Sequence, residues 1–391
     1  MKKIIILTMG LICACTVQHQ VSKNEKKFIS TIPIQIADDT IVNTQQQNIV
    51  KFGQLLSDVH TSAASFNPIS YEKVSIHFKL SQPATITVKI FDSDHSLMQT
   101  IVNQQNMNAG NQIIYWDGTD LDRMIVPDEA YYFTIIAISE SGVQEIYDPT
   151  TFSGGIENFI DIVKINIQNQ TVTYSMPEMG RVMIRVGIAG GPLLKTLTVW
   201  EPKIKGTITE YWNGRDQDNI MDLFHHPDYK MIIVYFSLPE NSIITYGNKA
   251  ITFRDYKINL KNSRPMKPKR ESTIKNVSKH YHIPRTIDYP PKLKLSFINA
   301  KEKEGITHIK GKTIIRLDLN EMDKKLFQND QFEICVYLDY KFLVEDEAGS
   351  MPFNWVWDTS EVKKGEHILS FNLSTYKDQV SVISRKIKVI E

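Results

Sequence analysis

Three aspartates within one short segment are the clearest group whose types and spacing could do chemistry. Asp117, Asp120 and Asp122 are spaced i, i+3 and i+5, so their carboxylates could collect a calcium ion. Calcium takes about six to eight oxygen ligands, and no distal acidic clamp follows Gly118 as it does in an EF-hand loop. We therefore expect a hairpin turn, in which aspartate side chains bond their own backbone. The sequence predicts no metal and no cofactor.

Two histidine pairs and one glycine-rich segment carry weaker signals. The pairs lie in loop-like sequence, His225 with His226 and His280 with His282. Neither pair has a cysteine or a spaced second pair beside it, so surface histidines are expected rather than a zinc site. Gly187-Ile188-Ala189-Gly190-Gly191 is followed by Pro192 and a strand pattern, where a dinucleotide-binding loop needs a helix. This segment predicts a β-turn.

Signatures of catalysis do not occur in the sequence. It contains neither Gly-x-Ser-x-Gly nor His-Glu-x-x-His. Cys335 lies in an alternating apolar stretch with no histidine close by, which favours a small buried hydrophobic residue over a nucleophile. No pair of carboxylates with the spacing of a glycosidase can be singled out. We predict that the protein is not an enzyme, and a hydrolase with an unrecognised site stays as the alternative.

One segment is strongly basic although the whole chain is nearly neutral. The net charge is +1, which provides no field to attract nucleic acid. Residues 257–285 nevertheless hold nine Lys or Arg residues and one acid, Glu271. Lys267, Lys269 and Arg270 could contact anionic envelope polymers or lipid head groups, each contributing about 1 kcal/mol at most. Because prolines interrupt this stretch, a solvated linker is the favoured interpretation.

Two tryptophans give a second candidate contact. Trp355 and Trp357 lie two residues apart, so both rings face the same side of a strand. They could form a platform on which a sugar stacks. Core filling is the favoured alternative.

The first residues indicate where the protein resides. Lys2 and Lys3 precede the apolar run Ile4–Ile12, which is too short to cross a bilayer. The start resembles a bacterial lipoprotein signal, in which cleavage after Ala14 leaves Cys15 to be acylated. An ordinary secretory peptide and acylation of Cys13 are the weaker alternatives. Acyl chains would hold the protein on a membrane, and the lack of acidic residues in Thr16–Gln20 slightly favours a periplasm-facing position over the cell surface.

A segment of the chain recurs 96 positions later. Phe78, Leu80, Ile86, Val88, Ile90, Leu97, Thr100, Tyr115, Trp116, Gly118 and Asp120 correspond to Tyr174, Met176, Val182, Ile184, Val186, Leu193, Thr196, Tyr211, Trp212, Gly214 and Asp216. The alignment has no gap through Asp216 and then slips. One β module has therefore been used twice, and the repeated apolar positions fix its fold while its loops vary.

Alternation of apolar and polar residues predicts the strands that carry these motifs. The expected strands are Val74–Leu80, Ile86–Ile90, Leu97–Val102, Gln112–Trp116 and Tyr131–Ile138, then Thr171–Met176, Arg181–Ile188, Leu193–Trp200, Thr207–Trp212 and Tyr229–Leu238, and finally Leu293–Phe297, Thr313–Leu319, Gln331–Leu338, His367–Leu373 and Val380–Val389. No amphipathic helix of useful length is expected. Short strands separated by turns describe antiparallel sandwiches.

The repeated module resembles a known family. Residues 75–139 resemble the immunoglobulin-like domain of the flagellar hook-capping (FlgD-like) proteins, through Trp116-Asp117-Gly118-Thr119-Asp120 and Val126-Pro127-Asp128-Glu129-Ala130-Tyr131-Tyr132. The second copy keeps Trp212-Asn213-Gly214-Arg215-Asp216 and departs from the pattern at His226-Pro227-Asp228-Tyr229. The final block is similar to another bacterial immunoglobulin-like type. These resemblances imply spacers, adhesive units or assembly parts and no catalysis.

The repeated Trp-x-Gly signature also has a structural explanation. Trp116 and Trp212 each end a strand, where a large ring can cover one end of a sandwich. Asp117 and Asn213 can bond their own backbone, and Gly118 and Gly214 allow positive φ.

We therefore predict an all-β protein with three tandem immunoglobulin-like antiparallel β-sandwiches after a signal peptide and a polar stalk. The expected boundaries are a signal at 1–14, a stalk at 15–67, hook-capping-type domains at 68–150 and 158–260, a basic linker at 261–291 and a third domain at 292–391. The expected function is a non-catalytic, structural or protein-binding lipoprotein of the cell envelope. Its expected partners are the membrane and an unknown envelope protein or glycan, and glycan binding is the alternative function.

Overall fold

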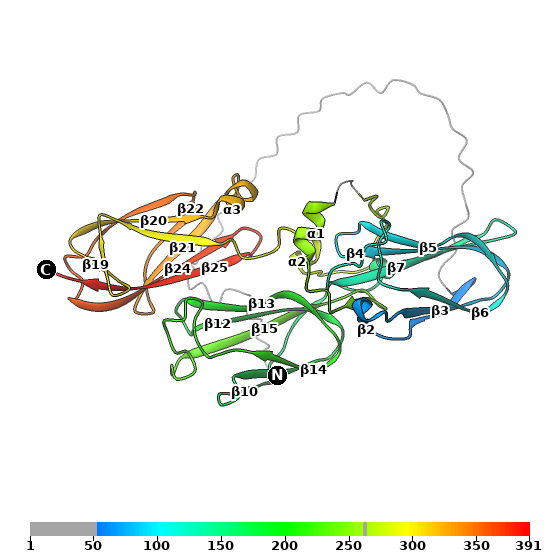
Figure 1. Cartoon of the computed structure of the whole chain (residues 1–391), viewed down its shortest axis with the longest axis horizontal. Helices are drawn as coiled ribbons and strands as arrows, with labels where there is room; N and C mark the ends of the chain where they lie inside the picture. The colour runs from blue at the N-terminus through cyan, green and yellow to red at the C-terminus, as the bar shows by residue number, and fades with distance from the viewer. Residues whose placement is uncertain (1–52, 261–263) are drawn as a thin grey trace, which may run out of the picture.

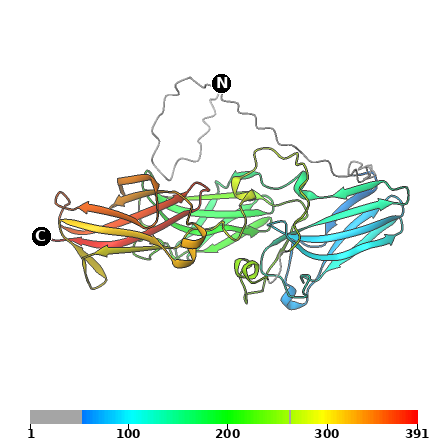
Figure 2. The same ribbon diagram turned by 90° about the horizontal axis from the view of Figure 1, so that it is seen from above.

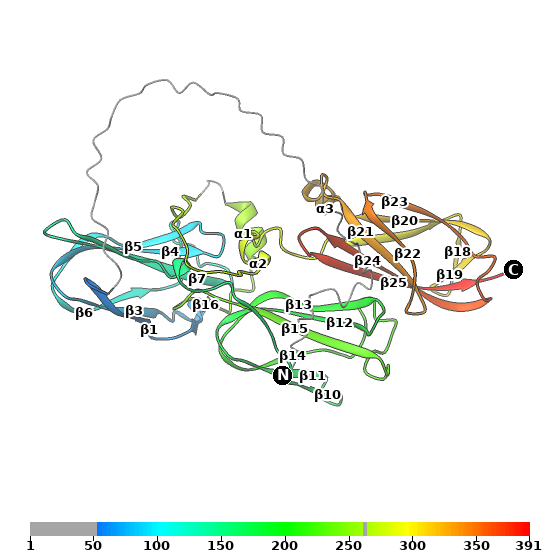
Figure 3. The same ribbon diagram turned by 180° about the vertical axis from the view of Figure 1, so that it is seen from behind.

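The chain folds into six antiparallel or mixed sheets that pair into three sandwiches, as a computed structural model shows for residues 53–260 and 264–391. The predicted all-β fold class is confirmed. Cys15 lies outside the described residues. Figure 1 and the view from behind in Figure 3 place the first and third sandwiches at opposite ends with the second between them, and Figure 2 shows the three as an elongated row.

The first sandwich packs the sheet β1-β3-β6 against a larger sheet in the order β2-β16-β7-β4-β5, with β8 paired to β7. Its elements are β1 (Leu56–Thr61), β2 (Ser65–Phe66), η1 (Pro68–Ser70), β3 (Val74–Leu80), β4 (Ala84–Asp92), β5 (Leu97–Met107), β6 (Gly110–Trp116), β7 (Ala130–Ser139), β8 (Gln144–Tyr147), η2 (Pro149–Thr151) and β16 (Ile243–Thr245). Alternating side chains such as Ile86, Val88 and Ile90 fill its core.

The second sandwich repeats this plan with the sheets β10-β11-β14 and β13-β12-β15-β9. Its strands are β9 (Glu157–Phe159), β10 (Val163–Asn166), β11 (Thr171–Met176), β12 (Gly180–Ile188), β13 (Leu193–Lys203), β14 (Gly206–Tyr211) and β15 (Tyr229–Ser237). The bounds of β12 and β13 are those of β4 and β5 moved by the predicted 96 residues, so the structure confirms the repeat. Ser139 pairs with Ala84, whereas Ser237 pairs with Gly180, so the second copy has gained two residues after Asp216.

The third sandwich has the sheets β17-β20-β23 and β18-β19-β25-β24-β21-β22. Its elements are β17 (Leu293–Ile298), β18 (Lys301–Lys303), β19 (Ile306–Ile309), β20 (Lys312–Leu319), α3 (Glu321–Leu326), β21 (Phe332–Leu338), β22 (Lys341–Gly349), β23 (Phe353–Asp358), β24 (Gly365–Thr375) and β25 (Val380–Val389). Asn372 on β24 donates to the Leu193 carbonyl at 2.7 Å and accepts from the Leu193 amide at 2.8 Å. The third sandwich therefore docks on the second through a buried polar pair.

The segment predicted to be a stalk begins to fold earlier than expected. β1 pairs with β3, and Leu55, Leu56 and Phe66 are buried in the first core, so residues 55–66 are part of the first sandwich. The alternation in β1 is broken because Asp58 has φ +53° and the register shifts beside it. A strand with such a bulge lacks the period-2 pattern on which the prediction depended.

The end of the second copy returns to the first sandwich. β16 pairs antiparallel with β7 and parallel with β2. Helix α1 (Phe253–Asn259) follows, and Ile243 and Tyr256 are buried in the first core. Residues 243–260 were predicted to end the second domain, yet their apolar side chains complete the first. Three residues of strand are too short to show a pattern, which explains the error.

Among residues 53–260 and 264–391, none of the helices has the length and apolar character needed to cross a bilayer.

Candidate functional site

The basic segment is an ordered strap that lies across the first two sandwiches. We define the strap as residues 253–260 and 264–290, which include α1 and the short helix α2 (Lys279–His282). Met266 bridges Ser96, and the Lys267 amide donates to the His95 carbonyl at 2.8 Å. Farther along, Val277 bridges Ile156 beside the second sandwich. The favoured interpretation as a solvated linker is therefore wrong.

The strap is held because its cations enter acidic sites of the first sandwich. Lys257 Nζ lies 2.6 Å from Asp92, and Lys267 Nζ lies 2.9 Å from Asp148. Both carboxylates are almost completely buried, at 0% and 2% side-chain exposure, and both lysines keep less than a seventh of their side chains exposed. Lysine stems can run along apolar surface while the ammonium group reaches a carboxylate. The neighbours supply the apolar burial that the strap lacks by itself.

A buried ion pair joins the first sandwich directly to the second. Arg181, the second residue of β12, pairs with Glu129, which precedes β7; the two side chains are 3% and 8% exposed. The Arg181 guanidinium also donates to Ser93 Oγ at 2.5 Å and to the Trp200 carbonyl at 3.0 Å. Glu129 in turn accepts from the Ala130 amide at 2.6 Å. A charged pair taken out of water stabilises a fold only when such further hydrogen bonds surround it.

The last part of the strap covers this ion pair. Arg285 donates to Asp288 at 2.6 Å, and its backbone amide donates to Asp94 at 2.8 Å. Burial and the nearby positive charge of Arg181 lower the pKa of Arg285 below its usual value. His280 lies 3.1 Å from Asp288 through Nδ1 and is 1% exposed. This histidine was expected on the surface, but the Trp200 ring packs on it at 4.4 Å between centroids.

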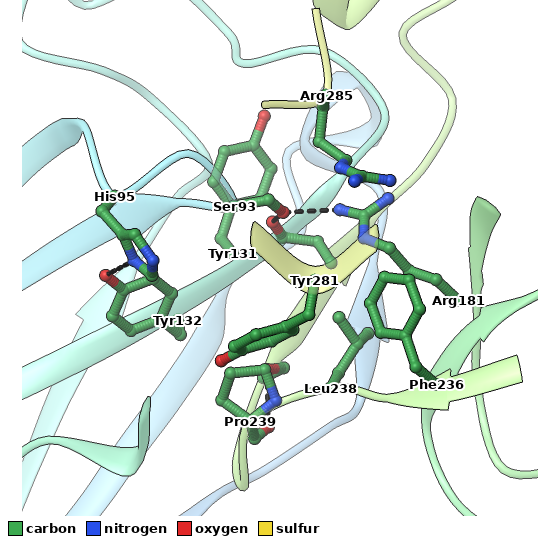
Figure 4. A pocket seen from close by; sticks show the side chains of 12 residues that line it. Ser93, His95, Tyr131, Tyr132, Arg181, Phe236, Leu238, Pro239, Tyr281 and Arg285 are labelled. Atoms are coloured by element: carbon green, nitrogen blue, oxygen red, sulfur yellow. Dashed lines mark hydrogen bonds between the residues drawn. The ribbon is translucent and has the colours of Figure 1, made fainter. Parts of the chain in front are cut away.

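Figure 4 shows that the polar groups of the junction surround a small cavity. Arg181 and Arg285 face it from one side, and His95, Tyr132 and Tyr281 border the other. The His95 ring lies 2.7 Å from the Tyr132 hydroxyl, and burial lowers the pKa of His95. About 20 Å³ is open to water-sized molecules, which is room for one or two waters and not for a substrate. The arrangement suits a fixed joint rather than a reaction.

Acidity should stabilise the folded chain through the buried carboxyl group of Asp92, although protonation removes the negative charge that faces Lys257. Burial raises the pKa of Asp92 from 3.8 to about 6, and Lys257 offsets only part of this increase. Because the folded pKa is raised, the stabilisation is fully present below pH 3.8 and is lost as pH rises through about 6. The difference amounts to about 3 kcal/mol. Urea unfolding between pH 4 and pH 7.5 should show this trend in the native chain, and the Asp92→Asn variant should lack it. Equal pH slopes in both proteins would contradict the assignment.

The other predicted contact residues differ in burial and in their partners. Lys267 is occupied by Asp148, whereas Lys269 is exposed and Arg270 is partly buried. Trp357 is 5% exposed, and Trp355 packs partly buried against the third core, with the two rings stacked at 5.3 Å. The pair faces inward and so forms no sugar platform on the surface. β23 places both rings on its buried side because residues i and i+2 share a face.

The Trp-x-Gly signature has the same structure in both copies. Trp116 Nε1 donates to the Thr119 carbonyl at 3.0 Å, and Trp212 Nε1 donates to the Arg215 carbonyl at 2.9 Å. Gly118 and Gly214 both have φ +75°. The two side chains after the tryptophans, Asp117 and Asn213, each accept a backbone N–H two residues later at 3.1 Å. The two copies therefore share one turn geometry.

The remaining candidates are turns or surface groups. The segment 187–191 forms the predicted β-turn between β12 and β13, where the Gly191 amide donates to the Ile188 carbonyl at 3.0 Å. His225 and His282 are exposed as expected. Cys335 is buried at the centre of β21, and its Sγ lies 3.6 Å from Glu333. Together with Glu345 these two residues are the one group with metal-ligand spacing within the described ranges, and they lie within 4.8 Å of one another.

Several residues of the junction could not be found from the sequence. Arg181 and Glu129 are 52 residues apart, and Arg285 meets Asp94 across an even longer separation. The only local signal was the excess of cations between residues 257 and 285, which indicated charge without indicating its partners.

No family model matches the chain, and no curated protein matches it. Among solved structures, an endo-beta-1,4-mannanase from Thermotoga petrophila is 19% identical with a TM-score of 0.19, over 29% of this chain and 22% of that chain. A structure concerning host cell surface retention by a bacterial ice-binding adhesin is 9% identical with a TM-score of 0.18, over 86% of this chain and 98% of that chain. A tandem repeat from the extending region of a large adhesion protein is 10% identical with a TM-score of 0.17, over 86% and 75% of the two chains. Similarity at this level carries no argument about function.

Proposed function

We propose that the chain is a rigid, non-catalytic spacer of the bacterial cell envelope that presents its third sandwich in a fixed direction. The observation that carries this proposal is the strap, whose buried cation–carboxylate pairs join parts of the chain that a simple linker would leave free. Tandem domains with small polar contacts are expected to move relative to one another. Here a buried ion pair, the strap and the Asn372–Leu193 pair oppose such motion.

The anchor in this proposal is the acylated Cys15, with the row of sandwiches extending from the membrane into the periplasm. The basis is the signal sequence alone: Lys2 and Lys3, the short apolar run and Ala14 before the cysteine. Two or more acyl chains bind a bilayer nearly permanently, so no spanning segment is required. The resemblance of the repeat to hook-capping immunoglobulin-like domains supports an assembly role without a flagellar one.

A protein partner suits the third sandwich better than a glycan. The aromatic pair on β23 faces the core, whereas Ile298, Ile314 and Val356 lie opposite one another in register on the outer face of β17-β20-β23. These three side chains are 38%, 37% and 60% exposed. Aliphatic rows of this kind favour protein contacts, since sugars stack on flat aromatic rings. The hydrolase alternative gains nothing from the junction cavity, which has no room for a substrate.

Spin-label distances test the spacer directly. Cysteines would be placed at Lys79 in β3 and Lys386 in β25, both exposed, in an acyl-free protein whose Cys13 and Cys15 are replaced by serine. We expect one narrow distance distribution that is unchanged at high salt, because buried ion pairs are little screened. A broad distribution would show a flexible chain and reject the proposal. Membrane fractionation of a Cys15→Ala variant, compared with Cys13→Ala, tests the anchor.

A further inference from the structure

The acidic turn that follows each Trp-x-Gly signature holds an arginine in both copies of the repeat. In the first copy, Arg264 of the strap lies 2.9 Å from Asp120 and 2.8 Å from Asp122. In the second copy, Arg385 of β25 lies 2.8 Å from Asp218, the residue 96 positions after Asp122. The two arginines come from different parts of the chain, and yet they reach equivalent places on the repeat.

Backbone amides of the turn hold the first aspartate of each site in place. Asp120 accepts the backbone amides of Asp122 and Met124 at 2.9 Å each through Oδ1, which leaves Oδ2 for Arg264. Its counterpart Asp216 accepts the amides of Ile220 and Met221 at 2.7 and 2.8 Å. Backbone hydrogen bonds therefore fix the carboxylates of Asp120 and Asp216. The amides of Asp122 and Asp218 each donate to that aspartate two residues earlier, so both turns place the second acidic residue in the same way.

Both arginines lie in or beside segments that pair with a strand edge. Arg264 is two residues before Met266, which bridges Ser96 at the edge of the first sandwich. Arg385 lies inside the strand β25, and the neighbouring Ser384 amide donates to Asp218 Oδ2 at 2.7 Å. Asp218 therefore accepts hydrogen bonds from both the arginine side chain and the backbone of the same strand, so binding depends on the side chain and on the backbone position.

We propose that Asp120 with Asp122, and Asp218 in the second copy, form a docking site for the guanidinium group of an extended segment, built into the repeated module. The ligand class is an arginine side chain on a strand-like segment, and this chain supplies two such ligands itself. The planar guanidinium offers several donors in a fixed fork, which a lysine ammonium group does not. This inference deepens the proposed spacer function and rests on it for its purpose, because docking at equivalent sites sets how each copy holds the next segment.

The two copies differ in strength. Arg264 and Asp120 are 7% and 1% exposed, whereas Arg385 and Asp218 are 39% and 22% exposed. Solvent screens the second pair, so its contribution should be smaller than that of the first. In the first copy the Tyr256 hydroxyl also donates a 2.6 Å hydrogen bond to Asp120.

Hydrogen exchange on the full chain tests the docking site with one reporter for each copy. The Lys267 amide, bonded to the His95 carbonyl, reports the strap, and the Leu193 amide, bonded to Asn372, reports the contact of the second and third sandwiches. We expect Arg264→Lys to speed exchange at Lys267 about tenfold. Arg385→Lys should speed exchange at Leu193 about threefold. Each variant should leave the other reporter unchanged.

A double variant and a matched control complete the test. The double variant Asp218→Asn with Arg385→Gln should exchange its Leu193 amide no faster than either single variant, because both changes remove the same interaction. Asp222→Asn, which changes an exposed carboxylate in the same loop, should leave Leu193 protected. Wild-type exchange in both lysine variants, or fully additive effects in the double variant, would overturn the docking site. If the hydrogen-exchange results are as expected but the spin-label distance distribution is broad, only the spacer function is rejected.

Discussion

Replacing Arg181 with methionine should lower the free energy of unfolding by about 3–5 kcal/mol. The change removes the cation paired with Glu129 in the buried junction, where both side chains are nearly inaccessible. A carboxylate left in that place loses its partner without regaining water, and this is the costly way to break a buried pair. Urea denaturation followed by tryptophan fluorescence measures the effect, because Trp200 lies beside Arg181 through its carbonyl.

Two further variants separate charge from packing in this experiment. Arg181→Met combined with Glu129→Gln should recover much of the loss, since a neutral pair needs less compensation in the interior. Lys364→Met breaks the ion pair with Glu391, whose side chains are 63% and 86% exposed, and should leave unfolding unchanged. If the double variant is as unstable as the single one, the loss comes from packing and the ion pair is not what holds the junction.

Gly214→Ala should be far more damaging than Gly190→Ala, although the two glycines have nearly the same backbone. Their φ angles are +75° and +69°, so alanine meets a similar conformational penalty of about 1–2 kcal/mol at both sites. At Gly214 the new Cβ would lie 1.9 Å from the Phe224 ring, whereas nothing lies within 4 Å at Gly190. Overpacking adds about 1–3 kcal/mol, so the total loss at Gly214 should reach about 2–5 kcal/mol.

Thermal denaturation of the two alanine variants measures this difference in one protein. Gly214→Ala combined with Phe224→Ala removes the clash while keeping the backbone penalty, so it should regain part of the lost stability. Equal melting temperatures for the Gly190 and Gly214 variants would mean that the Phe224 ring moves aside easily. In that case the tight fit of the signature turn has no energetic importance.

The repeated halves were predictable because their alternation is long and uninterrupted. β4 and β12 are nine residues long, and in each of them apolar residues recur at every second position, which identifies the face that packs into the sandwich core. The signature turns were predictable for a similar reason: glycine with positive φ and a side chain that bonds its own backbone are local devices. Local rules sufficed wherever the interacting groups are near one another in sequence.

The junction required information that no local pattern contains. β16 has three residues, and its place beside β7 depends on the path of the whole second copy. The basic residues of the strap show an excess of charge in the sequence, but carboxylate partners such as Asp92, the partner of Lys257, lie more than a hundred residues away. Charge clusters near prolines are usually solvated, and here tertiary contacts override that expectation.

The return of residues 243–260 to the first sandwich has a consequence for biogenesis. A polypeptide is synthesised from its N-terminus, so the first copy emerges well before β16 and α1 are available to it. Until then Ile243 and Tyr256 are missing from the first core, and the apolar side chains that they cover are exposed to water. The second copy, whose sheets draw on residues 157–237, completes first. We expect the incomplete first sandwich to need a chaperone during this interval, and a nascent chain halted before residue 243 to be degraded.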